Sequence, residues 1–170
     1  MCTKRELKNK NIYLTLLFVI ATFFFGYGAV NAATLQINSS TATIFPGETT
    51  TLYVVLNSEG VAVNNAEATI NFPPDLLEVL SVSKSGSVFS LWVEEPFFSN
   101  TSGVVTFNGG IPTPGFNGSK GPVVSIVVRA KKIGQADFLF ATGSVRANDG
   151  FGTDVLSSKQ GKSISVIKKE

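Results

Sequence analysis

The sequence predicts an all-β sandwich, and three observations support this fold class. Short runs of β-branched and aromatic residues recur every eight to twelve residues, separated by clusters of Gly, Pro, Asn and Ser. No window carries apolar residues at helical spacing over three turns. Several runs alternate apolar with polar residues, as a half-buried sheet requires. We therefore expect one compact β-domain.

The first 32 residues are predicted to be a secretory signal. Basic residues precede an uncharged apolar run from Ile12 to Val30. The run ends on Val30-Asn31-Ala32, which places small residues that a signal peptidase accepts at positions −3 and −1. We therefore place the cut after Ala32. An uncleaved membrane anchor is the alternative, because roughly 18 apolar residues can span a bilayer. In both cases residues 33–170 are expected to be extracellular or at the cell surface.

Residues 33–170 are numerous enough for one domain with its own core. Four of the 14 Lys and Arg residues and one of the 12 Asp and Glu residues precede residue 33, so the remainder carries a net charge of −1. This charge argues against nucleic acid as a partner. The only cysteine is Cys2 and histidine is absent, which excludes Ser-His-Asp and Cys-His nucleophiles and His/Cys metal sites. We expect no cofactor.

Strands are expected in chain order wherever apolar and β-branched residues cluster between turn residues. The expected strands are Thr34–Asn38, Ala42–Ile44, Thr49–Leu56, Asn65–Phe72, Leu77–Val82, Ser87–Val93, Val104–Asn108, Val123–Ala130, Ala136–Phe140, Ser144–Ala147 and Ser163–Ile167. Between the second and third, Pro46-Gly47 predicts a turn.

Alternation assigns the two faces of the strand Asn65–Phe72. Every second residue from Ala66 to Phe72 is apolar and is expected to face the core. In Val104–Asn108 the same rule sends Val105 and Phe107 inward. The residues left on a flat, outward polar surface are Asn65, Glu67, Thr69, Asn71, Thr106 and Asn108. A partner can bind such a surface without a pocket.

Several segments, in this order, resemble a bacterial cohesin domain. They are Thr34–Ile37 with Phe45–Glu48, Ala68–Val79, Gly103–Phe107, Gly121–Ile126 with Ala130–Gly134, and Ser144–Val155. The resemblance covers roughly residues 34–167. It implies a nine-stranded jelly-roll sandwich, akin to carbohydrate-binding modules, that binds a dockerin module or a polysaccharide within cellulose-degrading assemblies. By position, it implies that Asn65 and Glu67 contact the dockerin.

Two acidic segments are candidate chemical sites. Glu94-Glu95 is the only adjacent carboxylate pair, but a glycosidase needs two carboxyls facing each other about 5–10 Å apart, and neighbours on a strand diverge. We expect a solvated strand end before Pro96. Asn148-Asp149-Gly150 and Asp154 lack the register of an EF-type calcium loop. A tight turn is expected there, with a weak calcium site as the alternative.

Trp92 and Phe116 are candidate carbohydrate contacts, because sugar rings stack on exposed aromatic faces. Packing against the core is the alternative for both rings. Phe116 lies in the segment Gly109–Gly118, whose Gly and Pro content predicts a long surface loop. Glycan-acceptor triplets of the form Asn-x-Ser/Thr also occur, at Asn38, Asn100 and Asn117.

The function these patterns favour is that of a secreted, non-catalytic binding module. Its expected partner is a dockerin-type protein module or a polysaccharide, with membrane contact only if the N-terminal segment stays uncleaved. A structural or adhesive cell-surface domain, such as a surface-layer or pilus-like spacer, is the alternative. An enzymatic function is the third hypothesis, and no set of residues supports it.

The signal prediction can be tested on the exported protein. Because the small-residue site ends at Ala32, the protein recovered outside the cytoplasm should begin at Ala33. Intact-mass spectrometry measures this directly. A mass that retains residues 1–32, found in the membrane fraction, contradicts cleavage and indicates an anchor.

Overall fold

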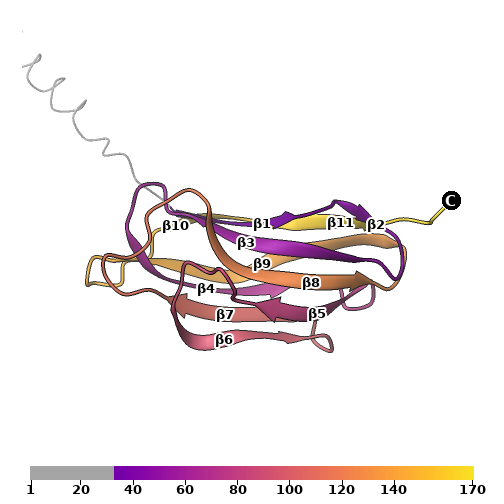
Figure 1. The fold of residues 1–170 in the computed structure, drawn as a ribbon, viewed down its shortest axis with the longest axis horizontal. Helices are drawn as coiled ribbons and strands as arrows, with labels where there is room; N and C mark the ends of the chain where they lie inside the picture. The colour runs from indigo at the N-terminus through magenta and orange to yellow at the C-terminus, as the bar shows by residue number, and fades with distance from the viewer. Residues whose placement is uncertain (1–32) are drawn as a thin grey trace, which may run out of the picture. The chain divides into compact units, whose positions relative to one another are not determined.

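The computed structural model describes residues 33–170, which form two packed β-sheets (Figure 1). Most strands run along the long axis, and the loops that connect them lie mainly at the two ends. The strands are β1 (Ala33–Ser39), β2 (Thr43–Ile44), β3 (Thr49–Asn57), β4 (Val63–Asn71), β5 (Leu77–Ser83), β6 (Leu91–Ser99), β7 (Val104–Gly110), β8 (Gly121–Ala130), β9 (Gly134–Ala147), β10 (Leu156–Gln160) and β11 (Lys162–Val166). The predicted signal, residues 1–32, lies outside the described residues.

The connectivity confirms the predicted jelly-roll sandwich. One sheet has the order β10-β1-β3-β8-β5 and the other has the order β2-β11-β9-β4-β7-β6. Paired strands are antiparallel, except that β1 with β10 and β2 with β11 are parallel. Between successive strands the chain changes sheet at every connection but one, and β6 and β7 alone follow each other within one sheet. In the described residues there are eleven strands, whereas the resemblance to cohesin domains implied nine.

The core lies between the sheets and is built by alternation. In β3, Leu52, Val54 and Leu56 are fully buried. Phe107 of β7 and Phe138 of β9 are the largest fully buried side chains. Each buried side chain of this size contributes about 1.5–3 kcal/mol to folding. No helix in residues 33–170 is long and apolar enough to cross a membrane.

The prediction of two strands near β9 is wrong. The expected strands Ala136–Phe140 and Ser144–Ala147 are parts of one long strand, which continues through a register irregularity opposite Thr69 and Ile70. A β-bulge inserts one extra residue and shifts the alternation of side chains without ending the strand. The alternation of polar and apolar residues is therefore interrupted although the strand continues.

Two further strands differ from expectation. Instead of Ser87–Val93, β6 covers Leu91–Ser99 and runs through Glu94, Glu95 and Pro96, so the expected strand end before Pro96 is wrong. An edge strand tolerates proline, because on its open side no neighbouring strand needs a backbone N–H as a hydrogen-bond donor. Strand β10 was missed because its residues are mostly exposed and polar, and show no alternation.

The predicted turn at Pro46-Gly47 is present. Glu48 N donates to Phe45 O at 3.0 Å, and Gly47 has a φ of 87°, which favours glycine. The turn connects β2, in one sheet, to β3, in the other.

Asn100, in the turn between β6 and β7, fastens this turn to β5. Its side chain accepts a hydrogen bond from Val79 N at 2.8 Å and donates to Val79 O at 2.9 Å. The register of β5 against β8 is irregular between Val79 and Ser81. The amide of Asn100 therefore pairs both backbone groups of Val79, as a neighbouring strand would.

Replacing Asn100 with Ala should destabilise the domain by about 1–3 kcal/mol, because Val79 N and O lose their partners. Urea unfolding followed by circular dichroism measures the change. Asn38→Ala is the matched control, because Asn38 is exposed on β1, and its effect should stay within about 0.5 kcal/mol. Equal stability of the two variants contradicts the role given to Asn100.

Candidate functional site

The polar surface predicted for β4 and β7 is present. Ala66, Ala68 and Ile70 of β4 are buried, as are Val105 and Phe107 of β7, so the predicted inward sets are confirmed. The residues between them on the two strands are Asn65, Glu67, Thr69, Asn71, Thr106 and Asn108. The two strands pair directly, with Glu67 opposite Asn108 and Thr69 opposite Thr106. The six predicted residues thus share one surface.

The surface extends over β6 and β9, which flank these strands. Strand pairing orders its residues into rows across β6, β7, β4 and β9. The rows are Leu91–Gly110–Asn65–Arg146, Glu94–Asn108–Glu67–Ser144, Phe97–Thr106–Thr69–Thr142 and Ser99–Val104–Asn71–Leu139. We call this set the polar face. Its large exposed apolar side chains, Leu91, Phe97 and Leu139, lie on the two outer strands.

A bulge in β9 brings polar side chains onto the polar face. Ile70 pairs with Phe140 and Thr69 pairs with Thr142, so Ala141 is the extra residue. Phe140 packs against the core, whereas Thr142 lines the outer surface. The bulge therefore turns the residues after Ala141 to the opposite side from those before it.

Glu67 is the centre of a hydrogen-bond network on this face. Its two carboxylate oxygens accept from Ser144 Oγ at 3.0 Å and from Asn108 Nδ2 at 3.1 Å. Asn65 Nδ2 donates to Asn108 Oδ1 at 2.7 Å and to a backbone carbonyl of β7 at 2.9 Å. The guanidinium of Arg146 lies 3.9 Å from Glu67 Oε1. The network joins β4, β7 and β9 and fixes the orientation of these side chains.

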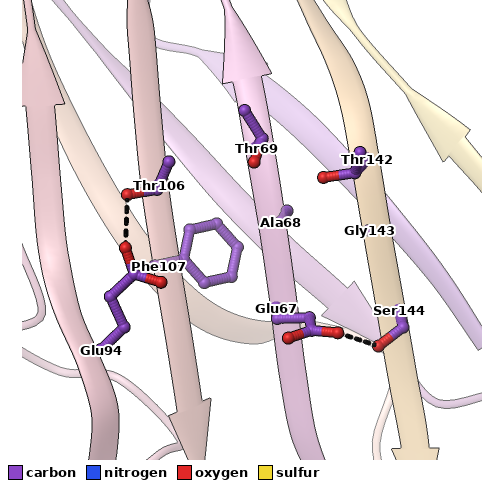
Figure 2. Close-up of a pocket in the computed structure, with 9 residues that line it drawn as sticks. All are labelled: Glu67, Ala68, Thr69, Glu94, Thr106, Phe107, Thr142, Gly143 and Ser144. Carbon is purple, nitrogen blue, oxygen red and sulfur yellow. Dashed lines mark hydrogen bonds between the residues drawn. The ribbon is translucent and has the colours of Figure 1, made fainter.

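A shallow hollow of about 390 Å³ lies beside this network. Figure 2 shows it between Glu94 on one side and Thr142 and Ser144 on the other, with Glu67 and Thr69 in the middle. Thr106 Oγ1 donates to Glu94 Oε1 at 3.0 Å. Within the described residues, the hydroxyls of Thr69 and Thr142 have no hydrogen-bond partner. They are available to a bound molecule.

The hydrogen-bond balance of the polar face favours a partner that donates. The side-chain amides of Asn65 and Asn108 and the hydroxyls of Thr106 and Ser144 already donate within the face. Carboxylates accept more than one hydrogen bond per oxygen, so much of the remaining capacity of the face is for accepting. The face carries two carboxylates and one guanidinium in its rows. Hydroxyl, amide or cationic donors complement it.

Prediction from sequence found the centre of the face and missed its flanks. Glu94 was assigned to a strand end, but it lines the hollow from β6. The sequence pattern does not predict that β9 contributes Thr142, Ser144 and Arg146 to this face, because the bulge disrupts the alternation from which faces are assigned. Phe97 lies in a row with Thr106 and is 58% exposed, so it belongs to the polar face.

The two candidate carbohydrate contacts both pack against the core. Trp92 and Phe116 are partly buried there. The rings of Trp92 and Phe89 meet edge to face with their centroids 6.4 Å apart, and Lys84 Nζ lies 5.7 Å from the Trp92 ring centroid. The Phe116 ring lies over Gly121. The packing alternative thus describes the position of both rings.

The adjacent carboxylates Glu94 and Glu95 have different partners, as expected for strand neighbours. Glu94 accepts from Thr106 on the polar face. Glu95 pairs with Lys84 at 2.6 Å, and both of these side chains are largely exposed. An exposed ion pair of this kind contributes little to stability.

The segment after β9 forms the predicted turn. Asp149 Oδ1 accepts from Phe151 N at 2.8 Å and Gly152 N at 3.1 Å, and Oδ2 accepts from the Thr153 hydroxyl. Chiefly the Thr153 hydroxyl, and next the Phe151 N–H, hold the pKa of Asp149 below its ordinary value. Gly150 and Gly152 have positive φ, as the turn requires. In residues 33–170 no group of three or more His, Cys, Asp or Glu side chains could hold a metal ion.

Comparison with solved structures identifies the fold. A cohesin in a type I cohesin–dockerin complex from Clostridium thermocellum aligns with a TM-score of 0.68 at 11% identity, covering 85% of this chain and 99% of that chain. The seventh ScaB type I cohesin from Pseudobacteroides cellulosolvens aligns at 0.66 and 16%, covering 82% and 94%. A non-cellulosomal cohesin from the archaeon Archaeoglobus fulgidus aligns at 0.64 and 15%, covering 82% and 94%. The domain has the cohesin fold.

Sequence comparison adds no relative. No protein-family model matches the chain. No curated protein matches it in sequence.

The position of Trp92 can be tested by fluorescence, because it is the only tryptophan. A Cβ at Gly109 would lie 2.9 Å from Trp92 Cζ3 and 3.0 Å from Phe89. Gly109→Ala should therefore displace the indole, shift its emission to longer wavelength and destabilise the domain by about 1–3 kcal/mol. Thr69→Ala, on the outer surface, is the control and should leave the emission unchanged. An unchanged spectrum in Gly109→Ala contradicts this packing.

Proposed function

We propose that this domain is a secreted, non-catalytic docking module that binds a dockerin-bearing protein through the polar face. The observation that carries the proposal is a flat face whose polar side chains are held in place by one another, on a domain with the cohesin fold. Several solved cohesins with this fold are in complex with dockerins. A role in extracellular polysaccharide degradation is the setting that we propose for this docking.

The chemistry of the polar face suits protein docking. Polar side chains line the hollow, several of them hydrogen-bonded to one another, and the exposed apolar side chains Leu91 and Phe97 lie on the edge strand β6 of the same face. Pre-ordered side chains reduce the entropy lost on binding. The hollow is shallow and open, so recognition has to come from a matching surface rather than from enclosure.

Assembly into a fibre by strand addition is less well supported. The edge strand next to the polar face is β6, and it contains Pro96, two adjacent glutamates and two register irregularities. Prolines, charges and bulges at an edge oppose pairing with another chain. We therefore propose docking by side chains of the face and not by its edge.

The test uses Ala33–Glu170, which contains the whole described core, and purified dockerin modules encoded in the same genome. Isothermal titration should detect binding to at least one dockerin. Asn65→Ala with Glu67→Ala should weaken it about 10-fold or more, because the central network is lost. Circular dichroism should show that the variant is folded, since both side chains lie on the surface.

Gln36→Ala is the control for this double variant, because Gln36 lies on β1 in the other sheet. Its affinity should equal that of the unmodified domain. Parallel sedimentation with cellulose, xylan and chitin separates the glycan alternative. Binding to a polysaccharide with no binding to any dockerin would refute the docking proposal.

A further inference from the structure

Phe151 stands out among the apolar side chains of residues 33–170 because it is 91% exposed, more than any other large one. It lies in the loop between β9 and β10, at the end of the sandwich opposite the C-terminus. A single exposed apolar residue is common on protein surfaces. This one differs because its backbone is held in a fixed conformation.

Two sets of contacts hold the loop in place. Asp149 accepts hydrogen bonds from the backbone N–H groups of Phe151 and Gly152 and from the Thr153 hydroxyl. At the base of the loop, Asn148 N donates to Ala62 O at 2.8 Å. The Phe151 ring is therefore displayed from an ordered backbone, which lowers the entropy cost of using it in a contact.

Arg146 connects this loop to the polar face. Its Nη1 donates to Gly152 O at 2.9 Å, and its Nη2 lies 3.9 Å from Glu67 Oε1. Arg146 ends the row that contains Asn65 and Leu91. The loop thus continues the polar face past the end of β9, and one side chain contacts both.

We propose that Phe151 is an apolar contact residue of the docking surface and inserts into an apolar pocket on the same protein partner that covers the polar face. This proposal rests on the docking function proposed above. Aromatic residues dominate the binding energy of many interfaces once they are desolvated in a pocket of the partner. The donor-rich surface that fits Glu67 and Glu94 would therefore adjoin an apolar pocket. Arg146 and Asp149 act as positioning residues, because they act through the loop.

The experiment measures the affinity of Ala33–Glu170 for the dockerin modules used above. Phe151→Ala should weaken binding about 10- to 100-fold, mainly through faster dissociation. Asp149→Ala keeps the ring but frees the loop, so it should weaken binding by less. Ile133→Ala is the control, because Ile133 is also exposed, at 57%, but lies in the turn between β8 and β9 at the other end. It should bind normally.

A second measurement does not depend on affinity. Phe151→Trp keeps a large apolar ring, and its emission should shift to shorter wavelength when the dockerin is added, because the indole enters an apolar pocket. The Phe151 variants should unfold at the same urea concentration as the unmodified domain, since the side chain is almost fully exposed.

The outcomes separate the two proposals. Unchanged affinity in Phe151→Ala, with binding still weakened by Asn65→Ala and Glu67→Ala, overturns the role of Phe151 and leaves the docking function standing. Binding of phosphatidylcholine vesicles that is lost in Phe151→Ala, with dockerin affinity unchanged, assigns the ring to a membrane and also overturns the proposal. If the unmodified domain binds no dockerin, the docking function fails and this proposal fails with it.

Discussion

The strict alternation of side chains along a strand is the constraint on which this domain depends. With the only cysteine at Cys2, no disulfide can cross-link residues 33–170, so the two sheets are held by the apolar side chains packed between them. Each strand must send one set of residues inward, and the opposite set then faces solvent. A slip of one residue in β4 would bury Glu67 and expose Ile70. The core thereby determines which residues form the polar face.

Strand β9 is where two demands of this rule conflict. Phe138 and Phe140 have to face inward near its start, whereas Ser144 and Arg146 face outward near its end. All four have even numbers, so an unbroken strand would place them on one side. The extra residue at Ala141 resolves the conflict. The same bulge completes the network around Glu67, because it presents the Ser144 hydroxyl to the carboxylate.

The four strands of the polar face also show how far the sequence can predict the site. In β4 and β7 the alternation is uninterrupted, and it correctly assigned both the buried and the outward residues. In β9 a bulge depends on the partner strand, and no local pattern marks it. In β6 the edge position tolerates Pro96, although a proline in the sequence predicts the end of a strand. The fold was predictable because most of its strands are half-buried and therefore alternate. The flanks of the polar face were not predictable, because they are determined by how distant strands pair.

The contact between Asn100 and β5 has a practical consequence for producing this protein. Asn100-Thr101-Ser102 is an acceptor triplet for N-linked glycans, and the nitrogen that would carry the sugar is the one that donates to Val79 O. A eukaryotic secretory host that modified Asn100 would place a bulky, hydrated glycan against the β5 strand. Protein from such a host would differ from bacterially produced protein where the β6–β7 turn meets β5. The choice of expression host is therefore a structural variable for this domain.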